Sequence, residues 1–212
     1  MRQTCIITSF CAVRDNKLIL DGKILYESTS GDFTEFASRL YRHSEISYPK
    51  FHKMDNLCKL GFMASEFLLK DKDLANRYPG VETGIILMNS SSSLDTDRTY
   101  QKSITSRDNY FPSPSVFVYT LPNIVIGEIC IRHKIYGENN FFVTEKFNPA
   151  FMFDYVSQLF DNDLVECCIT GWVEVNGSNY GAVLYLIEKT GKTESGIANF
   201  ELSEIEKINN SK

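Results

Sequence analysis

Residues 139–174 read NNFFVTEKFNPAFMFDYVSQLFDNDLVECCITGWVE, a stretch that predicts a strand, a helix and a second strand in succession. Asn139–Thr144 is short and contains two phenylalanines and a valine, which predicts a central strand. Asn148–Phe160 opens with a good N-cap residue and a proline in the first turn, so it predicts a helix. Leu164–Val175 is again apolar and β-branched, and it predicts the next strand.

The alternation of strands and helices continues on both sides of this stretch. Asn176-Gly177 is a hairpin signal that leads to a last strand over Tyr180–Glu188. Strands that alternate with helices predict an α/β layered domain with a mixed sheet. The other predicted elements are a first strand over Cys5–Val13, a hairpin around Asp21-Gly22, helices that start at Asp32 and Asp55, a buried strand over Thr83–Asn89 and a helix over Pro122–Lys134.

The composition supports one compact domain and excludes several classes of protein. The chain has 212 residues, is 43% hydrophobic and carries a net charge of −5. It is too apolar for a disordered chain, and its acidic balance argues against a nucleic-acid binder. Its apolar runs fall short of the ~20 residues that cross a bilayer, so we expect no membrane span. The run Cys5–Val13 resembles part of a secretory signal, but its β-branched residues favour a buried strand.

The six cysteines indicate a reducing compartment. None belongs to a C-x-x-C pair, and most lie inside apolar runs, so they predict small buried side chains in a cytoplasmic protein. They are Cys5, Cys11, Cys58, Cys130, Cys167 and Cys168.

Three segments have weaker patterns. Ser90–Ser113 begins with four serines and has few apolar anchors, so we expect a long surface loop there. Gly127 interrupts a predicted helix, which suggests close backbone packing at that point. We assign residues 1–190 to the domain and residues 191–212 to a polar C-terminal tail. The apolar anchors in the tail are Phe200, Leu202, Ile205 and Ile208.

Motifs for common active sites are absent from the sequence. The histidines have no metal-ligand spacing, so we expect neither a metal nor a cofactor. Three aspartates in the predicted loop, Asp95, Asp97 and Asp108, fit a solvated surface better than a cation site. The histidines are His43, His52 and His133.

Several short sequence motifs occur in a recognisable order along the chain. Ile131-Arg132, Gly137 and Asn139-Asn140 precede the predicted central strand, and Gly171–Glu174 (GWVE) ends the next strand. In this order they resemble the N-terminal half of the β-ketoacyl-acyl carrier protein synthases, condensing enzymes of the thiolase-like fold. The resemblance covers roughly residues 4–190. It implies one half of a thiolase-like layered fold, with a mixed five-stranded sheet and helices on both faces.

The resemblance also places a nucleophilic cysteine in the turn after the central strand. This sequence reads Thr144, Glu145, Lys146 and Phe147 there, with Lys146 at the nucleophile position. A helix N-terminus activates a thiolate, whereas lysine is protonated at pH 7 and its acylation gives a stable amide. The two catalytic histidines of the family come from a C-terminal half that would begin where this chain stops, at Lys212. We therefore expect no catalytic residue, and we expect that this chain alone does not carry out the condensing reaction of the family.

The function that the resemblance implies is association with another chain. Members of the family dimerise by pairing the central strand, which here consists of Asn139, Asn140, Phe141, Phe142, Val143 and Thr144. We expect a homodimer, or a heterodimer with a full-length ketoacyl synthase of the kind that chain-length factors form. Acyl carrier protein is a further candidate partner. The expected setting is fatty-acid or polyketide biosynthesis of the aryl-polyene kind, in the cytoplasm.

Three alternatives remain open at this point. Cys167 or Cys168 could serve as a relocated nucleophile of an acyltransferase or condensing enzyme, or Lys146 could act as a base if burial lowered its pKa. A small-molecule module could use Ser90–Ser113 as a lid. Finally, five apolar residues could line an acyl tunnel, although their helical spacing favours ordinary core: Phe147, Phe151, Met152, Phe153 and Tyr155.

Overall fold

The computed structural model describes residues 3–29, 32–108, 110–193 and 196–210, and its strands form one sheet. The sheet order is β3-β2-β1-β7-β6-β4-β5, and β8 pairs with β1 beside this path. The strands are β1 (Cys5–Arg14), β2 (Lys17–Leu20), β3 (Lys23–Glu27), β4 (Thr83–Asn89), β5 (Asn139–Val143), β6 (Cys167–Asn176), β7 (Asn179–Lys189) and β8 (Ala198–Asn199). The helices are α1 (Phe33–His43), α2 (Asn56–Leu68), α3 (Leu74–Arg77), α4 (Leu94–Ile104), α5 (Pro114–Phe117), α6 (Ile124–His133), α7 (Pro149–Asp161) and α8 (Leu202–Asn210), with single 3-10 turns η1 (Pro49–Lys53), η2 (Gly80–Glu82) and η3 (Val118–Thr120).

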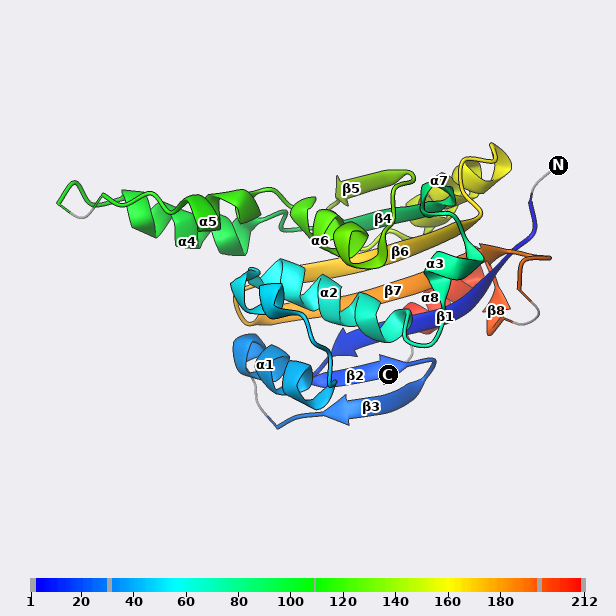
Figure 1. The fold of residues 1–212 in the computed structure, drawn as a ribbon, viewed down its shortest axis with the longest axis horizontal. Coiled ribbons are helices and arrows are strands. Elements are labelled where there is room, and N and C mark those ends of the chain that lie inside the picture. Colours follow the sequence, from blue (N-terminus) through cyan, green and yellow to red (C-terminus); the bar gives the residue numbers. More distant parts are fainter. Residues whose placement is uncertain (1–2, 30–31, 109, 194–195, 211–212) are drawn as a thin grey trace.

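The sheet is mixed, as predicted, and larger than predicted. β4 runs parallel to β5 and β6, while the pairs β1–β7 and β6–β7 are antiparallel. The strands β1, β7, β6, β4 and β5 make the expected five. The hairpin of β2 and β3 continues the sheet beyond β1, and β8 adds a short pairing, so the described residues contain an eight-stranded sheet (Figure 1). The hairpin was predicted from Asp21-Gly22, but its addition to the sheet was not.

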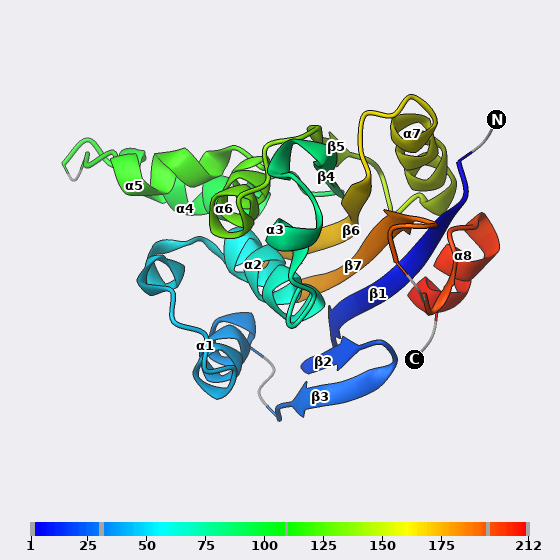
Figure 2. The same cartoon turned by 45° about the vertical axis from the view of Figure 1, so that its right-hand side comes forward.

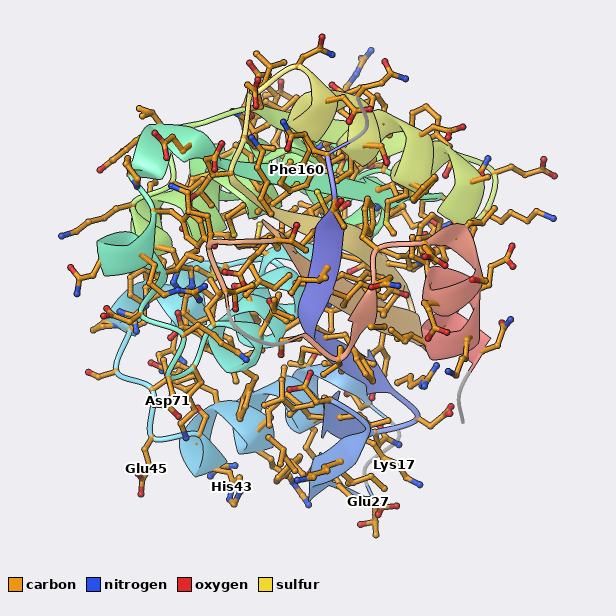
Figure 3. The ribbon with its side chains drawn as sticks, turned by 90° about the vertical axis from the view of Figure 1, so that its right-hand side faces the viewer. Lys17, Glu27, His43, Glu45, Asp71 and Phe160 are labelled. Carbon is orange, nitrogen blue, oxygen red and sulfur yellow. The ribbon has the colours of Figure 1, made fainter. Side chains whose placement is uncertain are left out.

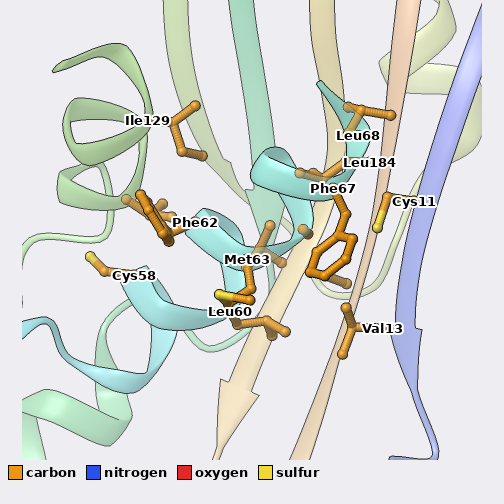
Figure 4. Close-up of a cluster of buried hydrophobic side chains, with 14 of the residues drawn as sticks. Cys11, Val13, Cys58, Leu60, Phe62, Met63, Phe67, Leu68, Ile129 and Leu184 are labelled. Carbon is orange, nitrogen blue, oxygen red and sulfur yellow. The ribbon is translucent and has the colours of Figure 1, made fainter. Parts of the chain in front are cut away.

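Helices α1, α2 and α6 cover one face of the sheet (Figure 2). Asp32 and Asp55 cap α1 and α2, as predicted, because their carboxylates accept from Thr34 N and Cys58 N. The capped α2 is buried on nearly all sides, so its apolar residues fill the space between the sheet and α6. Figure 4 shows this core, in which Phe62 of α2 lies on the side of Ile129 of α6 and Met63 lies beside Leu60.

The close packing that we expected at Gly127 occurs at another glycine. A Cβ at Gly61 of α2 would lie 2.3 Å from Cγ2 of Val125 in α6, so only glycine allows the two helices to approach at that point. A Cβ at Gly127 would meet nothing within 4 Å. The expectation for Gly127 was therefore wrong.

The second face of the sheet is covered by α7 and by the C-terminal segment with β8 and α8 (Figure 2). Phe160 of α7 is buried in this layer (Figure 3). In the segment that we predicted to be a polar tail, Phe200, Ile205 and Ile208 are buried against the sheet and α7. The domain boundary at residue 190 stays a prediction, but the ordered structure continues past it.

The long loop predicted over Ser90–Ser113 is wrong in part, because residues 94–104 form α4. Only Thr96 of α4 is fully buried, and this explains why its sequence has no apolar stripe. In the described residues no single helix is long and apolar enough to cross a bilayer, and one pair that is bent by 97°, Pro114–Thr120 with Ile124–His133, passes by length and composition alone.

Candidate functional site

Three parallel strands place their carboxyl ends at one edge of the sheet. β4 ends at Asn89 and β5 at Val143, and the next residue, Thr144, donates its backbone N–H to the carbonyl of Asn89 at 2.9 Å. β6 lies on the other side of β4 and continues beyond this point to Glu174. Ligand sites of α/β proteins commonly form at such carboxyl ends, so this end of the sheet is the first candidate for a site.

Glu174 holds the serine turn that follows β4. Its Oε2 accepts the backbone N–H of Ser90 at 2.7 Å, the hydroxyl of Ser90 at 2.6 Å and the N–H of Ser91 at 3.3 Å. Asn89 closes the same turn, because its side chain both accepts from Ser92 N and donates to Ser92 O. Glu174 is buried, and its second oxygen has no hydrogen-bond partner among the described residues. The residues after β4 are therefore fixed to β6 by one buried carboxylate.

The turn between β5 and α7 contains the position of the expected nucleophile. The hydroxyl of Thr144 donates to the carbonyl of Lys146 at 2.9 Å, and Asn148 caps α7 by accepting from Phe151 N at 3.0 Å. Glu145 and Lys146 are both exposed. The turn thus lies at the junction of strand and helix, as the resemblance implies. It places the charged Lys146 side chain in solvent near a helix N-terminus, an arrangement that is unfavourable for the helix dipole.

Neither cysteine of the alternative mechanism is accessible. Cys167 and Cys168 lie inside β6, and both side chains are fully buried. Burial raises the pKa of both thiols well above the ordinary value, so the reactive thiolate is not available at neutral pH. All six cysteines are free. This geometry argues against a relocated nucleophile at Cys167 or Cys168.

The histidines are held by separate partners. The His43 ring lies 5.1 Å from the Tyr26 ring, and the His52 ring lies 5.3 Å from the Tyr41 ring. His133 lies on α6, with Nε2 3.0 Å from Oε1 of Glu66. The three belong to α1, η1 and α6, so the fold does not assemble them into one site. In the part of the chain that the structure describes, no group of three or more His, Cys, Asp or Glu side chains could hold a metal ion.

The five residues considered for an acyl tunnel belong to the core of the second face. Met152 is fully buried, while the other four are half-buried and pack against the same cluster. The Phe151 ring lies 4.9 Å from the Phe142 ring of β5, and the Phe147 ring lies 5.9 Å from Trp172 of β6. Phe153 contacts Phe200 and also lines a cavity of about 270 Å³ beside the start of β1. The aromatic contacts support ordinary core packing for this group.

β5, which we predicted as a pairing strand, lies at an open edge of the sheet. In the described residues it pairs with β4 alone. Phe141 packs towards the first face and Phe142 towards the second, which leaves Asn139 and Val143 exposed. Asn140 donates from Nδ2 to the hydroxyl of Tyr155 at 2.6 Å, and this bond fixes the edge to α7. The edge is therefore both ordered and uncovered.

A second polar cluster was missed by the sequence analysis. Asp55, predicted only as a helix start, lines a cavity of about 270 Å³ together with Asp95 and Thr96 of α4 and Tyr119 of η3. Burial raises the pKa of Asp55, although hydrogen bonds from Thr96 and Cys58 lower it. Asp95, which we expected at a solvated surface, accepts from Asn56 Nδ2 at 3.1 Å and from Gly177 N at 3.1 Å. These contacts link segments that are far apart in sequence, so pattern alone could not find them.

Proteins that are similar to this chain are found among solved structures. No protein-family profile matches the chain, and no curated protein matches it. A chain of the ishigamide ketosynthase/chain length factor superposes with a TM-score of 0.68 at 16% identity, over 90% of this chain and 63% of that one. This observation decides the fold, since the topology agrees over nearly all of the chain. The chain has the thiolase-like fold of one ketosynthase half.

Two further ketosynthase-like structures agree with this assignment. One is from AntDE:AntF, a type II PKS acyl-carrier protein in complex with its ketosynthase, with a TM-score of 0.65, 15% identity, and 91% of this chain and 65% of that one covered. Another is from the ketosynthase ApeO in complex with its chain length factor ApeC from Xenorhabdus doucetiae, with a TM-score of 0.55, 12% identity, and 88% and 79% covered. This chain spans less than two thirds of the first two structures. The ketosynthase-like fold that the resemblance implies is thereby confirmed.

Proposed function

We propose that this chain is a non-catalytic ketosynthase-like subunit that works by association with an active ketosynthase. The proposed setting is a cytoplasmic fatty-acid or polyketide pathway of the aryl-polyene kind. The observation that carries the proposal is the pair of features at β5: an ordered, uncharged, open edge strand, followed by a turn without a thiol.

The turn supports the non-catalytic part of the proposal. A condensing reaction of this kind needs a nucleophile that carries an acyl group as a thioester, together with donors that stabilise an oxyanion. Residues 144–149 read TEKFNP, and the cation at Lys146 is exposed. A protonated amine in water is a poor nucleophile, and acylation of a lysine would end in an amide rather than a transferable thioester.

The edge supports the associative part of the proposal. An exposed strand offers unpaired N–H and C=O groups, and addition of another strand satisfies them. Similar structures are ketosynthase complexes by their names, one with a chain length factor and one with an acyl-carrier protein. A ketosynthase is therefore the first partner to test, a second copy of this chain is the next, and an acyl carrier protein is the third.

Co-purification tests the association. The full-length chain would be co-expressed with the ketosynthase encoded nearest to it and separated by size-exclusion chromatography with light scattering. We expect a defined complex of the two chains. A chain that stays monomeric alone, with that ketosynthase and with acyl carrier protein would overturn the proposal.

Intact-mass analysis tests the absence of catalysis. The chain would be incubated with an acyl-carrier-protein thioester, with the partner ketosynthase as a positive control. We expect a covalent acyl adduct on the ketosynthase alone. An adduct on this chain, mapped to Cys167, Cys168 or Lys146, would support the enzyme alternative, whereas reversible binding of the free acyl chain would support an acyl-binding module.

A further inference from the structure

A helical arm stands beside the open edge. We use the term arm for residues 94–121, apart from residue 109, which comprise α4, α5, η3 and their connections. Figure 1 shows the arm extending beyond the end of the sheet, away from the layers that form the core. Its members pack mainly on one another: α4 contacts α5 and η3, and Phe111 N donates to Ser103 O at 2.9 Å.

The arm exposes an unusual share of the large apolar side chains. Of the fourteen that are exposed in the described residues, six lie in the arm: Leu94, Tyr110, Phe111, Phe117, Val118 and Leu121. Phe111 is 75% exposed. Single exposed apolar residues are normal, but a group on one projecting segment marks an interaction site.

Polar contacts hold the arm in one position on the body. Arg98 donates from Nη1 to Oδ1 of Asn176 at 2.6 Å, at the hairpin of β6 and β7. Asp95 accepts from Gly177 N in the same hairpin, and Thr96 donates to Asp55 at 2.6 Å at the start of α2. The arm is thus fixed at its base to two separate elements. A surface that is ordered before binding loses less conformational entropy when a partner covers it.

The arm is continuous with the β5 edge. Val143 is exposed at the end of β5, and Thr144 binds the carbonyl of Asn89 at the end of β4. Four residues later Ser93 starts α4 and donates its hydroxyl to the carbonyl of Thr120, one residue before the exposed Leu121. A direct path of bonded residues therefore leads from the strand edge to the apolar residues of the arm.

The charge of the arm indicates the chemistry of the partner. Residues 94–121 contain three acidic and three basic side chains: Asp95, Asp97, Asp108, Arg98, Lys102 and Arg107. An acidic protein or a nucleic acid would require a net positive surface, and the arm has none. Its exposed aromatic and aliphatic residues instead suit an apolar surface on a folded protein.

We infer that the arm is the second half of the docking surface, and that it packs on the body of the same ketosynthase-fold chain that pairs with β5. This inference rests on the proposed function and adds to it the place where apolar burial stabilises the complex. Strand pairing gives main-chain hydrogen bonds at the edge, and the arm gives side-chain contacts that distinguish one partner from another.

A pair of double variants tests the inference. Phe111→Ser with Leu121→Ser removes two apolar side chains from the arm, and Ile24→Ser with Leu25→Ser removes two exposed side chains from β3 at the opposite edge. All four side chains are exposed, so we expect unchanged thermal unfolding of both variants. Affinity for the full-length ketosynthase encoded nearest to the chain is then measured by isothermal titration calorimetry.

We expect the arm variant to bind at least ~10-fold more weakly, since truncation of an interface anchor typically costs this much, and the β3 variant to bind within about twofold of the native chain. Equal affinity of the arm variant and the native chain would overturn the inference and leave the proposed function intact. A native chain that forms only a homodimer, dissociated by the arm variant, would overturn the assignment of the partner. Failure of the native chain to bind would refute the proposed function itself.

Discussion

The two outermost strands of the sheet, β3 and β5, expose similar apolar side chains but differ in charge. β3 reads KILYE, with a charged residue at each end, and Glu27 lies 3.4 Å from Lys17 on the neighbouring strand. Lys17 and Glu27 are seen at the surface of the hairpin in Figure 3. β5 reads NNFFV and has no charge. Ile24 on β3 and Val143 on β5 are almost equally exposed, at 53% and 54%.

This difference in charge indicates which edge strand is available for pairing with another strand. Lysines and other charges on an edge strand oppose the addition of another strand, because they would lose water on pairing. β3 has this protection, and β5 does not. Within one sheet, one edge is thus closed by charge and the other is left open beside the arm.

The largest expected effect is on the free energy of unfolding, and it comes from a substitution in β6, a strand in the middle of the sheet. Gly171 of β6 has φ +151°, and a Cβ there would lie 1.9 Å from the carbonyl oxygen of Val183. We expect Gly171→Ala to lower the free energy of unfolding by about 4 kcal/mol, through strain and displacement of β7. Urea unfolding measures this. Gly127→Ala is the control and should be neutral or stabilising by up to ~1 kcal/mol, since nothing lies within 4 Å.

A charge on the open edge should weaken the complex next most strongly. We expect Val143→Lys to reduce affinity for the ketosynthase ~100-fold, because the interface would bury an unpaired ammonium group. Ile24→Lys puts the same charge on the protected edge and should leave affinity unchanged within about twofold. Calorimetric titration of both variants gives the comparison. Equal weakening by the two substitutions would show that β5 is not the pairing edge.

The ion pair between α2 and α6 stabilises the helix that leads into β5. Arg132 donates from Nε and Nη2 to the two carboxylate oxygens of Glu66, each at 2.8 Å, and His133 Nε2 lies 3.0 Å away. Burial alone would raise the pKa of Glu66, but its contacts with His133 and Arg132 outweigh burial and hold the pKa below its usual value. We expect Glu66→Gln to lower the free energy of unfolding by about 1–2 kcal/mol at pH 7.

The pH dependence of this pair has a definite sign. Because the folded state has the lower pKa, the pair stabilises fully above the unfolded pKa of about 4.3 and is lost as pH falls through the folded value. The stability difference between the native chain and Glu66→Gln should therefore shrink below about pH 4. Chemical unfolding at pH 7, 5 and 3 measures it. A difference that stays constant across this range would contradict the assignment.

The smallest effect is expected at the base of the arm. Asp95→Ala removes the bonds from Asn56 and Gly177, which should cost about 1 kcal/mol locally and increase hydrogen exchange of arm amides ~5-fold. Asp108→Ala, at an exposed position of the arm, is the matched control and should change neither exchange nor affinity. Equal exchange in the two variants would mean that Asp95 does not hold the arm.

Burial explains which parts of the fold were predictable from sequence. The β4 strand and α2 are almost fully buried, so their apolar patterns are strong and both were predicted. The sequence predicts a loop at α4 because Thr96 is the one buried residue of this helix, so no apolar stripe is needed. β8 was missed since a two-residue strand has no period to detect.

The part of the candidate site that is formed by consecutive residues was predictable from the sequence, and the parts formed by residues distant in sequence were not. The order of strand, turn and N-cap around Lys146 follows from ten consecutive residues and is present in the structure, while the role of Lys146 stays a prediction. The hydrogen bond from Ser90 to Glu174 joins residues that are 84 positions apart in the sequence. The close approach of Gly61 and Val125 depends on how α2 packs against α6. Such pairings are set by tertiary packing, for which a single sequence carries no local signal.

The place of β1 in the sheet has a consequence for synthesis of the protein. Cys5 pairs with Lys189 and Val13 with Ala182, so β1 is synthesised well before β7, its main partner strand. Contacts of such long sequence separation form slowly, and the apolar β1 must wait for β7 while the residues between the two strands are translated. We expect nascent chains that are stalled before β7 to depend on chaperones and to be cleaved readily by protease, and chains released after β7 to become resistant.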